Sequence, residues 1–182
     1  MKKRLASLFQ ILALCLTMMP TGVWADAETV DGGVSTQSGN VAEVTTDGGT
    51  AKQYTDITKA FEDAQAADSA TVTLLQSVTL EQKKGITLTK GNITLDLSGQ
   101  TLSIAADDTS NGIILTASSA GDGESTTIST LTIQDSSTEG KIVQPNAIPA
   151  VRASGAGTLI IESGTIENTS STDDTTNCAV YV

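Results

Sequence analysis

The stretch ITLTKGNITLDLSGQTLSI, residues 86–104, decides the fold class of this chain. Apolar residues occupy every second position, which is the period of a strand with one buried face. Gly91 and Gly99 interrupt the alternation, and it resumes after each of them. The pattern therefore predicts short strands that are joined by tight polar corners and that bury one face each.

Runs of Val, Ile, Leu and Thr with the same alternation continue along most of the chain, and Gly, Asn, Asp or Ser separates nearly all of them. These runs cover residues 71–75, 78–80, 86–89, 93–97, 101–104, 112–117, 130–134, 141–143, 150–153, 158–162, 165–168 and 179–182. Composition and alternation predict a strand for each run.

The runs also repeat as larger units. The phrases ITLDLSGQTL, LTIQDSSTEGKI and LIIESGTI each contain a strand, a polar corner with Gly and a second strand. A further phrase recurs as GIILTA, PAVRAS and AVYV, with 38 residues from Ile113 to Val151 and 29 from Val151 to Val180. Spacings of this size, with loops that absorb the difference, are typical of solenoids, in which each coil stacks on the next.

One segment before the strands has the helical period instead. Apolar residues recur at i, i+3, i+4 and i+7 from Ile57, which predicts an amphipathic helix over residues 56–67 with Thr55 as its N-cap. The first coil of a solenoid has an unpaired edge and an open apolar end. We expect the helix to close that end by burying Ile57, Phe61 and Ala64.

The alternation also predicts which side chains point into the solenoid. The expected inward residues are Val72, Leu74, Leu88, Ile93, Leu95, Leu97, Leu102, Ile113, Leu115, Leu131, Ile133, Ile142, Val151, Leu159, Ile161 and Ile166. The phrases TVT and TLT resemble the Thr-rich faces of ice-binding solenoids, but they do not align in a long array, and strand propensity explains them better.

The opening AFEDAQAADSATVTLLQSVTL, followed by GITLTKGNITLDLSGQTLSI and later by GTLIIESGTIEN, resembles the pectin-lyase-like superfamily. Within it, the chain is most similar to repetitive exported surface proteins of bacteria. The resemblance covers residues 54–182 and implies an all-β, right-handed parallel β-helix with the helix at 56–67 as its N-terminal cap. Many activities share this architecture, so the resemblance says less about function.

The N-terminus carries an export signal. Basic residues at positions 2–4 precede a mostly apolar run at 5–19, and small residues follow at Ala25 and Ala27. This order predicts a secretory signal peptide over residues 1–25, and hence a secreted or cell-surface protein. Residues 26–53 are polar and rich in Gly, Ser, Thr and acids, which predicts a flexible leader with one short strand near 41–44.

The net charge of the chain limits the classes of molecule that it can bind. The net charge is −11, and it becomes −14 without residues 1–25, which hold three of the ten basic residues and none of the 21 acidic ones. Such a chain repels nucleic acid and anionic membranes, and no segment after the signal is long enough to span a bilayer. There is no His, and Cys178 would be the only thiol after signal removal, so an internal disulfide is excluded.

Candidate catalytic and metal-binding residues are few. A β-helix lyase acting on uronic-acid polymers would need Ca²⁺-binding carboxylates on one face with an Arg or Lys base beside them. Arg152 is the candidate base, with Asp135 and Glu162 as ligands on the neighbouring coils. Asp173 and Asp174 are further candidate ligands for Ca²⁺, and apart from this ion we expect no cofactor. The simpler interpretation is that the carboxylates lie at solvated corners and that Arg152 forms a surface ion pair.

The predicted fold and export signal are compatible with two functions. We expect an exported, non-catalytic surface or adhesion module that binds a polysaccharide or a host or cell-surface glycan. The alternative is a polysaccharide lyase or glycoside hydrolase of the pectin-lyase-like fold. The sequence closes on the strand-like phrase AVYV, although a solenoid normally has a cap at both ends. We expect either a fragment, a pairing with another subunit or an uncapped last coil.

Overall fold

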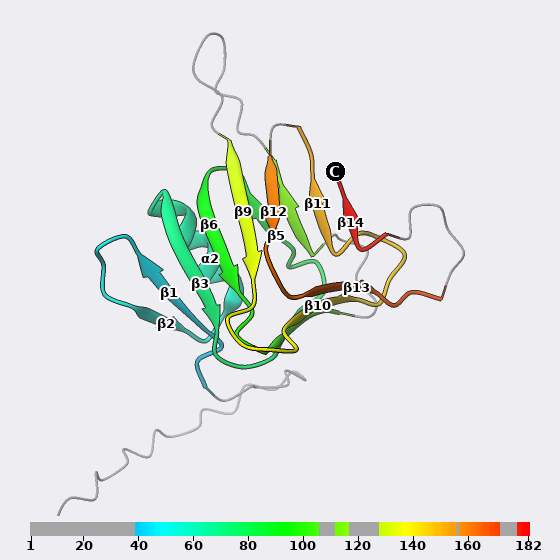
Figure 1. Ribbon diagram of the computed structural model, residues 1–182, viewed down its shortest axis with the longest axis horizontal. Helices are drawn as coiled ribbons and strands as arrows, with labels where there is room; N and C mark the ends of the chain where they lie inside the picture. The colour runs from blue at the N-terminus through cyan, green and yellow to red at the C-terminus, as the bar shows by residue number, and fades with distance from the viewer. Residues whose placement is uncertain (1–38, 106–111, 117–127, 156, 172–177) are drawn as a thin grey trace, which may run out of the picture. The chain divides into compact units, whose positions relative to one another are not determined.

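The computed structural model describes residues 39–105, 112–116, 128–155, 157–171 and 178–182 (Figure 1). The predicted signal peptide and the first part of the predicted leader, residues 26–38, lie outside this part of the chain. Within the described residues, strands and one helix form the regular structure, so the predicted β-rich class with one helix is confirmed.

The chain passes four times through the same three positions, and each pass adds one strand to each of three sheets. The passes consist of β3 (Ser69–Leu74), β4 (Val78–Leu80) and β5 (Ile86–Leu88); β6 (Gly91–Asp96), β7 (Thr101–Ile104) and β8 (Ile113–Leu115); β9 (Ser129–Gln134), β10 (Lys141–Gln144) and β11 (Val151–Ala153); and β12 (Thr158–Ile161), β13 (Thr165–Asn168) and β14 (Val180–Tyr181). We call the sheets A, B and C, after the first, second and third strand of each pass.

All pairing between passes is parallel. The register matches the repeats of the sequence, because Val151 lies opposite both Ile113 and Val180 in sheet C. In sheet A, Leu95 lies opposite Ile133, which lies opposite Ile161. Parallel strands need a long connection, and here the other two strands of each pass provide it. The prediction that successive repeats pair through parallel strands is therefore confirmed.

The predicted inward residues form the core, except in the last pass. Those of the first three passes, from Val72 to Val151, are all buried. Leu159 and Ile166 are only partly buried against this core, and Ile161 is 48% exposed. The prediction of a buried Ile161 is wrong, because β12 forms an edge of sheet A and no described strand stacks beyond it.

The helix α2 spans Ile57–Ala66 and buries the predicted apolar stripe. Its N-cap is Asp56 and not Thr55, because an Asp56 carboxylate oxygen accepts hydrogen bonds from the backbone N–H and the hydroxyl of Thr58. The helix packs against strands of the first two passes, with Phe61 only 1% exposed. The predicted amphipathic helix therefore exists, and it buries its apolar stripe against the hairpin side of the first pass.

The prediction of a flexible leader does not hold over residues 42–53. Strands β1 (Ala42–Thr46) and β2 (Lys52–Tyr54) form an antiparallel hairpin, and β1 also pairs antiparallel with β3. The expected strand near 41–44 is thus present, and Val41, Ala42 and Val44 are buried. These three apolar residues attach the hairpin to the core, although the surrounding sequence is polar.

The first pass is protected at two of its edges. In sheet A, β1 occupies the edge of β3 that would otherwise be unpaired. In sheet C, the side-chain amide of Gln65 on α2 reaches β5: its Nε2 donates to the Thr87 carbonyl over 3.0 Å, and its Oε1 accepts from the Thr89 N–H over 2.9 Å. The helix and the hairpin therefore share the protection that was expected of the helix alone.

Candidate functional site

Asp135, a predicted Ca²⁺ ligand, belongs to a corner between sheets A and B. Its Oδ1 accepts hydrogen bonds from the N–H groups of Gly99 and Ser137, and its Oδ2 accepts one from Gly140 over 2.8 Å. Gly140 is needed there, because a Cβ atom at that position would lie 2.6 Å from Cγ of Asp135. The Asp135 carboxylate as a whole thus accepts hydrogen bonds from the backbone of two successive passes.

Asp96 has the equivalent role one pass earlier, and sequence reasoning missed it. It is only 6% exposed, and its Oδ1 accepts 2.9 Å hydrogen bonds from the N–H groups of Ser98 and Ser136. Its Oδ2 accepts one from the Gln134 side chain over 3.2 Å. The available signal was the Asp in ITLDLSGQ, followed two residues later by a Ser-Gly corner, which is a pattern that favours an Asx turn.

The surroundings of Asp96 and Asp135 favour the ionised form of both carboxyl groups at neutral pH. Burial opposes the charge of Asp96, but hydrogen bonds from Ser136, Ser98 and Gln134 outweigh it and lower the pKa of this carboxyl. Desolvation likewise opposes the charge of Asp135, and N–H groups led by that of Gly99 lower its pKa. A carboxylate that stays ionised and fully engaged with backbone donors is poorly suited to acid–base catalysis near neutral pH.

Arg152, the predicted base, does not join these carboxylates. It lies in β11 of sheet C, whereas Asp135 and Glu162 follow β9 and β12 of sheet A. The Arg152 guanidinium lies 5.6 Å from the ring centroid of Tyr181, its register partner in β14. Arg152 therefore makes a cation–π contact on an exposed face. The expected surface ion pair is not among the ion pairs of the described residues.

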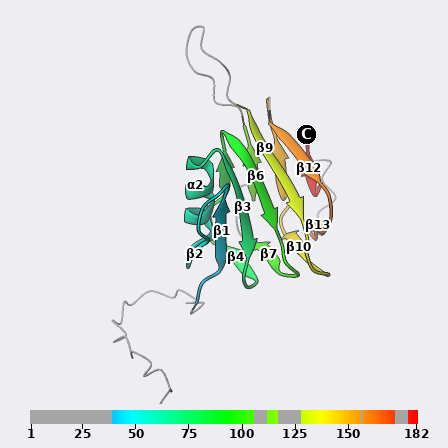
Figure 2. The same ribbon diagram turned by 60° about the vertical axis from the view of Figure 1, so that its left-hand side comes forward.

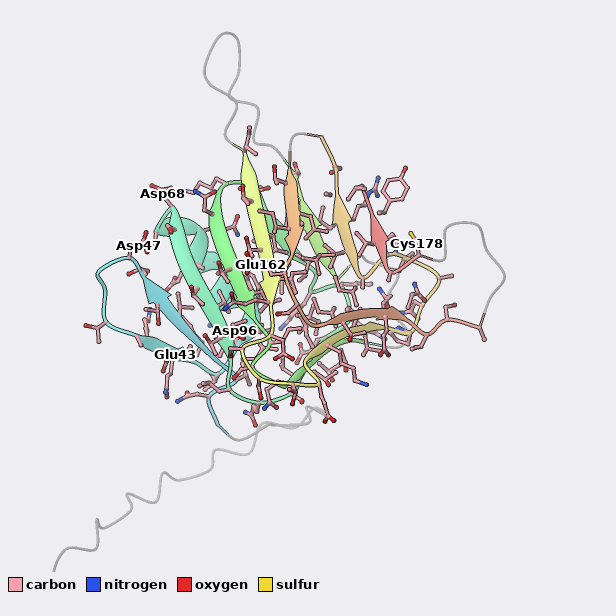
Figure 3. The ribbon with its side chains drawn as sticks, in the orientation of Figure 1. Glu43, Asp47, Asp68, Asp96, Glu162 and Cys178 are labelled. Carbon is pink, nitrogen blue, oxygen red and sulfur yellow. The ribbon has the colours of Figure 1, made fainter. Side chains whose placement is uncertain are left out.

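The remaining candidate ligands do not form a metal centre in the described part of the chain. Asp173 and Asp174 lie outside the described residues. Glu162 is exposed near the end of sheet A, away from Cys178, which lies beside β14 (Figure 3). Among the described residues, no group of three or more Cys, Asp or Glu side chains is placed to hold a metal ion.

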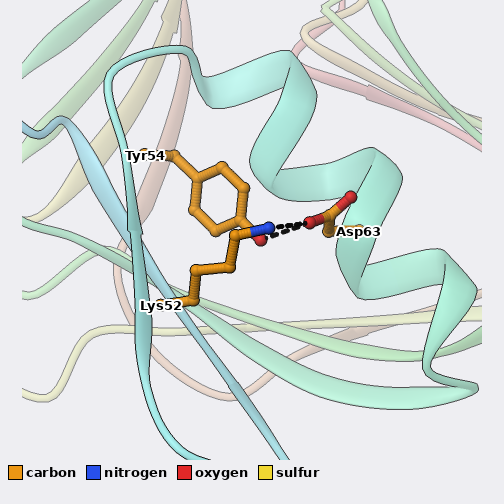
Figure 4. A network of polar contacts seen from close by, with 3 residues as sticks. All are labelled: Lys52, Tyr54 and Asp63. Carbon is orange, nitrogen blue, oxygen red and sulfur yellow. Dashed lines mark hydrogen bonds and ion pairs between the residues drawn. The ribbon is translucent and has the colours of Figure 1, made fainter.

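A pocket that sequence reasoning did not anticipate lies between the hairpin β1–β2 and the helix α2. Its volume is about 410 Å³, and it is lined by Val44, Thr46, Thr50, Lys52, Tyr54, Asp63, Ala66 and Ala67. Asp63 Oδ2 accepts hydrogen bonds from Lys52 Nζ over 2.6 Å and from the Tyr54 hydroxyl over 2.5 Å (Figure 4). The Lys52 ammonium also lies 4.8 Å from the centroid of the Tyr54 ring.

This group attaches the hairpin to the helix. The hydrogen bond to Asp63 raises the pKa of Lys52, and burial followed by the same carboxylate raises the pKa of Tyr54. The hydrogen bonds from Lys52 and Tyr54 lower the pKa of Asp63. All three shifts move away from neutrality, so the group supplies neither a free base nor an activated nucleophile at pH 7.

No protein-family model matches the chain, and no curated protein or solved structure matches it either. In the part of the chain that the structure describes, no helix has both the length and the apolar character needed to cross a lipid bilayer. Function must therefore be inferred from the arrangement of this chain's own residues.

Proposed function

We propose that this chain is an exported, non-catalytic surface or adhesion module that binds carbohydrate, built as a right-handed parallel β-helix of the pectin-lyase-like type. The handedness follows the general rule for crossovers between parallel strands, which are right-handed in about 98% of cases. Export rests on the signal pattern in residues 1–25. The parallel stacking of four passes supports the architecture.

The observation that carries the non-catalytic function is the use of the corner carboxylates. Asp96 and Asp135 direct their oxygens at donors of their own fold, and Arg152 lies on another sheet beside Tyr181. A lyase would need the carboxylates free to hold Ca²⁺ and the base close to them. The outer faces of the sheets are then the extended surfaces left for recognition.

One experiment separates binding from turnover. The purified chain is incubated with a panel of neutral and acidic polysaccharides, with and without Ca²⁺, and both its depletion from solution and the release of reducing or unsaturated ends are measured. We expect depletion by at least one polysaccharide and no release of new ends. Release that disappears in Arg152→Ala would instead establish the enzyme, and depletion by none of the polysaccharides would contradict carbohydrate binding.

A further inference from the structure

The outer face of sheet A carries ordered rows of polar side chains. Its strands lie side by side in Figure 2, and their register places residues of successive passes directly opposite one another. One row consists of Thr45, Thr71, Thr94, Thr132 and Ile160, and a second consists of Ser69, Asn92, Thr130 and Thr158. We expected no long array of Thr residues, and strand pairing places four of them in one row that ends at Ile160.

These rows have a regular spacing that follows from the sheet. Neighbouring strands lie about 4.8 Å apart, and side chains on one face of a strand repeat about every 6.6 Å. Each Thr presents one methyl group and one hydroxyl that can donate and accept. Thr71, Thr94 and Thr132 are partly exposed, so solvent reaches the centre of this row.

The same rows are free of charge in a strongly acidic chain. None of their nine side chains is ionisable, although the sequence contains 21 acidic and ten basic residues. The third row of this face holds Glu43 and Asp96, and Asp96 is buried and engaged. The outer faces of the other sheets also carry charge, at Lys141 and Glu167 in sheet B and at Arg152 in sheet C. The absence of charge from two adjacent rows resembles the depletion of charged residues at the core of binding interfaces.

Exposed apolar side chains lie on this face as well. Ile160, in the Thr row, is 43% exposed. Ile128 precedes the inward Ser129 of β9 and is 50% exposed, so the alternation of the strand places it on the outer side. A ligand for this face must therefore be uncharged, hydroxyl-rich and apolar in places, and it must be flat enough to reach several strands.

We propose that the outer face of sheet A binds a neutral polysaccharide laid across β3, β6, β9 and β12. Sugar rings offer hydroxyls for the Thr, Ser and Asn side chains and C–H surfaces for the Thr methyls and Ile160. An acidic polymer is disfavoured by the net charge of −11. A crystalline water surface would require an unbroken Thr grid, which Asn92 and Ile160 interrupt. This inference rests on the proposed carbohydrate binding and assigns a face and a ligand class to it.

The test compares two double variants that add the same charge to different faces. Thr94→Glu with Thr132→Glu places carboxylates at the centre of sheet A, whereas Thr79→Glu with Thr165→Glu places them on exposed positions of sheet B. Retention on cellulose, chitin and a soluble neutral β-glucan is measured, with polygalacturonate as the acidic comparison. We expect the sheet A variant to lose at least about tenfold in affinity and the sheet B variant to change less than about twofold.

A milder pair guards against misfolding. Thr94→Ala with Thr132→Ala removes the hydroxyls without adding charge, and we expect a smaller loss of retention with an unchanged circular dichroism spectrum. If the chain binds a neutral polysaccharide and the sheet A variants retain that binding, the face is wrong while the proposed function stands. If the chain binds none of the polysaccharides, both proposals fail. Inhibition of ice recrystallisation in that case would assign the Thr row to ice instead.

Discussion

The two ends of the stacked passes use similar residues to different effect. Val72 and Leu74 of the first pass are at most 1% exposed, because the hairpin and the helix α2 cover them. Ile161 of the last pass occupies the same kind of inward position and is 48% exposed. Inward direction is therefore set by the alternation of the strand, whereas burial requires a neighbour on both sides of the pass.

The largest expected effect tests this contrast within one row of sheet A. Ile133 is fully buried and lies opposite Ile161 in the next pass. Ile133→Ala should reduce the free energy of unfolding by about 2–5 kcal/mol, as large-to-small changes in a packed core do. Ile161→Ala should cost less than about 1 kcal/mol, because half of its side chain is already in water. Urea unfolding followed by circular dichroism measures both, and equal losses would mean that β12 is covered in solution.

The sequence predicted the inner passes well for a physical reason. Strict alternation and short polar corners leave a strand little choice of face, and all twelve predicted strands are present within a few residues of their expected bounds. The same reasoning could not detect that no strand of the described residues pairs with β12 beyond Ile161, since the local pattern of Ile161 is identical to that of Ile133. It predicted a strand near 41–44 but missed the second strand of the hairpin, β2, because Lys52 and Gln53 are polar and exposed.

The candidate site was less predictable, because it depends on contacts between passes. The repeat pattern suggested that Arg152 lies near Asp135 and Glu162. In the structure Arg152 belongs to sheet C, whereas the two acidic residues follow strands of sheet A. Asp96 and Asp135 are 39 residues apart in the sequence. The N–H group of Ser136, next to Asp135, donates to Asp96, and the loops between such partners differ in length from pass to pass. Sequence spacing alone carries no information on such contacts.

A second prediction sharpens the contrast at the corners. Asp96→Asn leaves backbone donors of two passes poorly paired, so we expect a loss of about 1–3 kcal/mol at pH 7. The last-pass variant Glu162→Gln changes an exposed carboxylate and should leave the free energy of unfolding nearly unchanged. Denaturant unfolding of both variants at pH 7 measures the difference, and an equal loss in the two would contradict the role of Asp96.

The pH dependence of that loss has a defined sign. The pKa of Asp96 in the folded chain lies below its ordinary value of 3.8, so its stabilisation is fully present above pH 3.8. It is lost as the pH falls through the lowered native pKa. The difference between the wild-type chain and Asp96→Asn should therefore shrink below about pH 4, which unfolding curves measured from pH 7 to pH 2 would detect. A difference that stayed constant over this range would exclude the carboxylate as its source.

The smallest expected effect concerns the protected edge of the first pass. Gln65→Ala removes the hydrogen bonds with Thr87 of β5 and with Thr89 just after it, and it should cost about 1 kcal/mol in thermal or denaturant unfolding. Because it also exposes a strand edge, we expect more light scattering at high protein concentration. Gln82→Ala, at an exposed position in the turn after β4, is the matched control and should change neither quantity.

The amide of Gln65 has a wider consequence for how this molecule stays apart from its own copies. It presents one acceptor and one donor to β5 in the way that the peptide group of a neighbouring strand would. The side chain of Gln65 therefore occupies the edge of β5 at which a strand of a second molecule could otherwise pair. Loss of this one side chain would leave β5 with an unpaired edge, which copies of the chain could use to pair with one another.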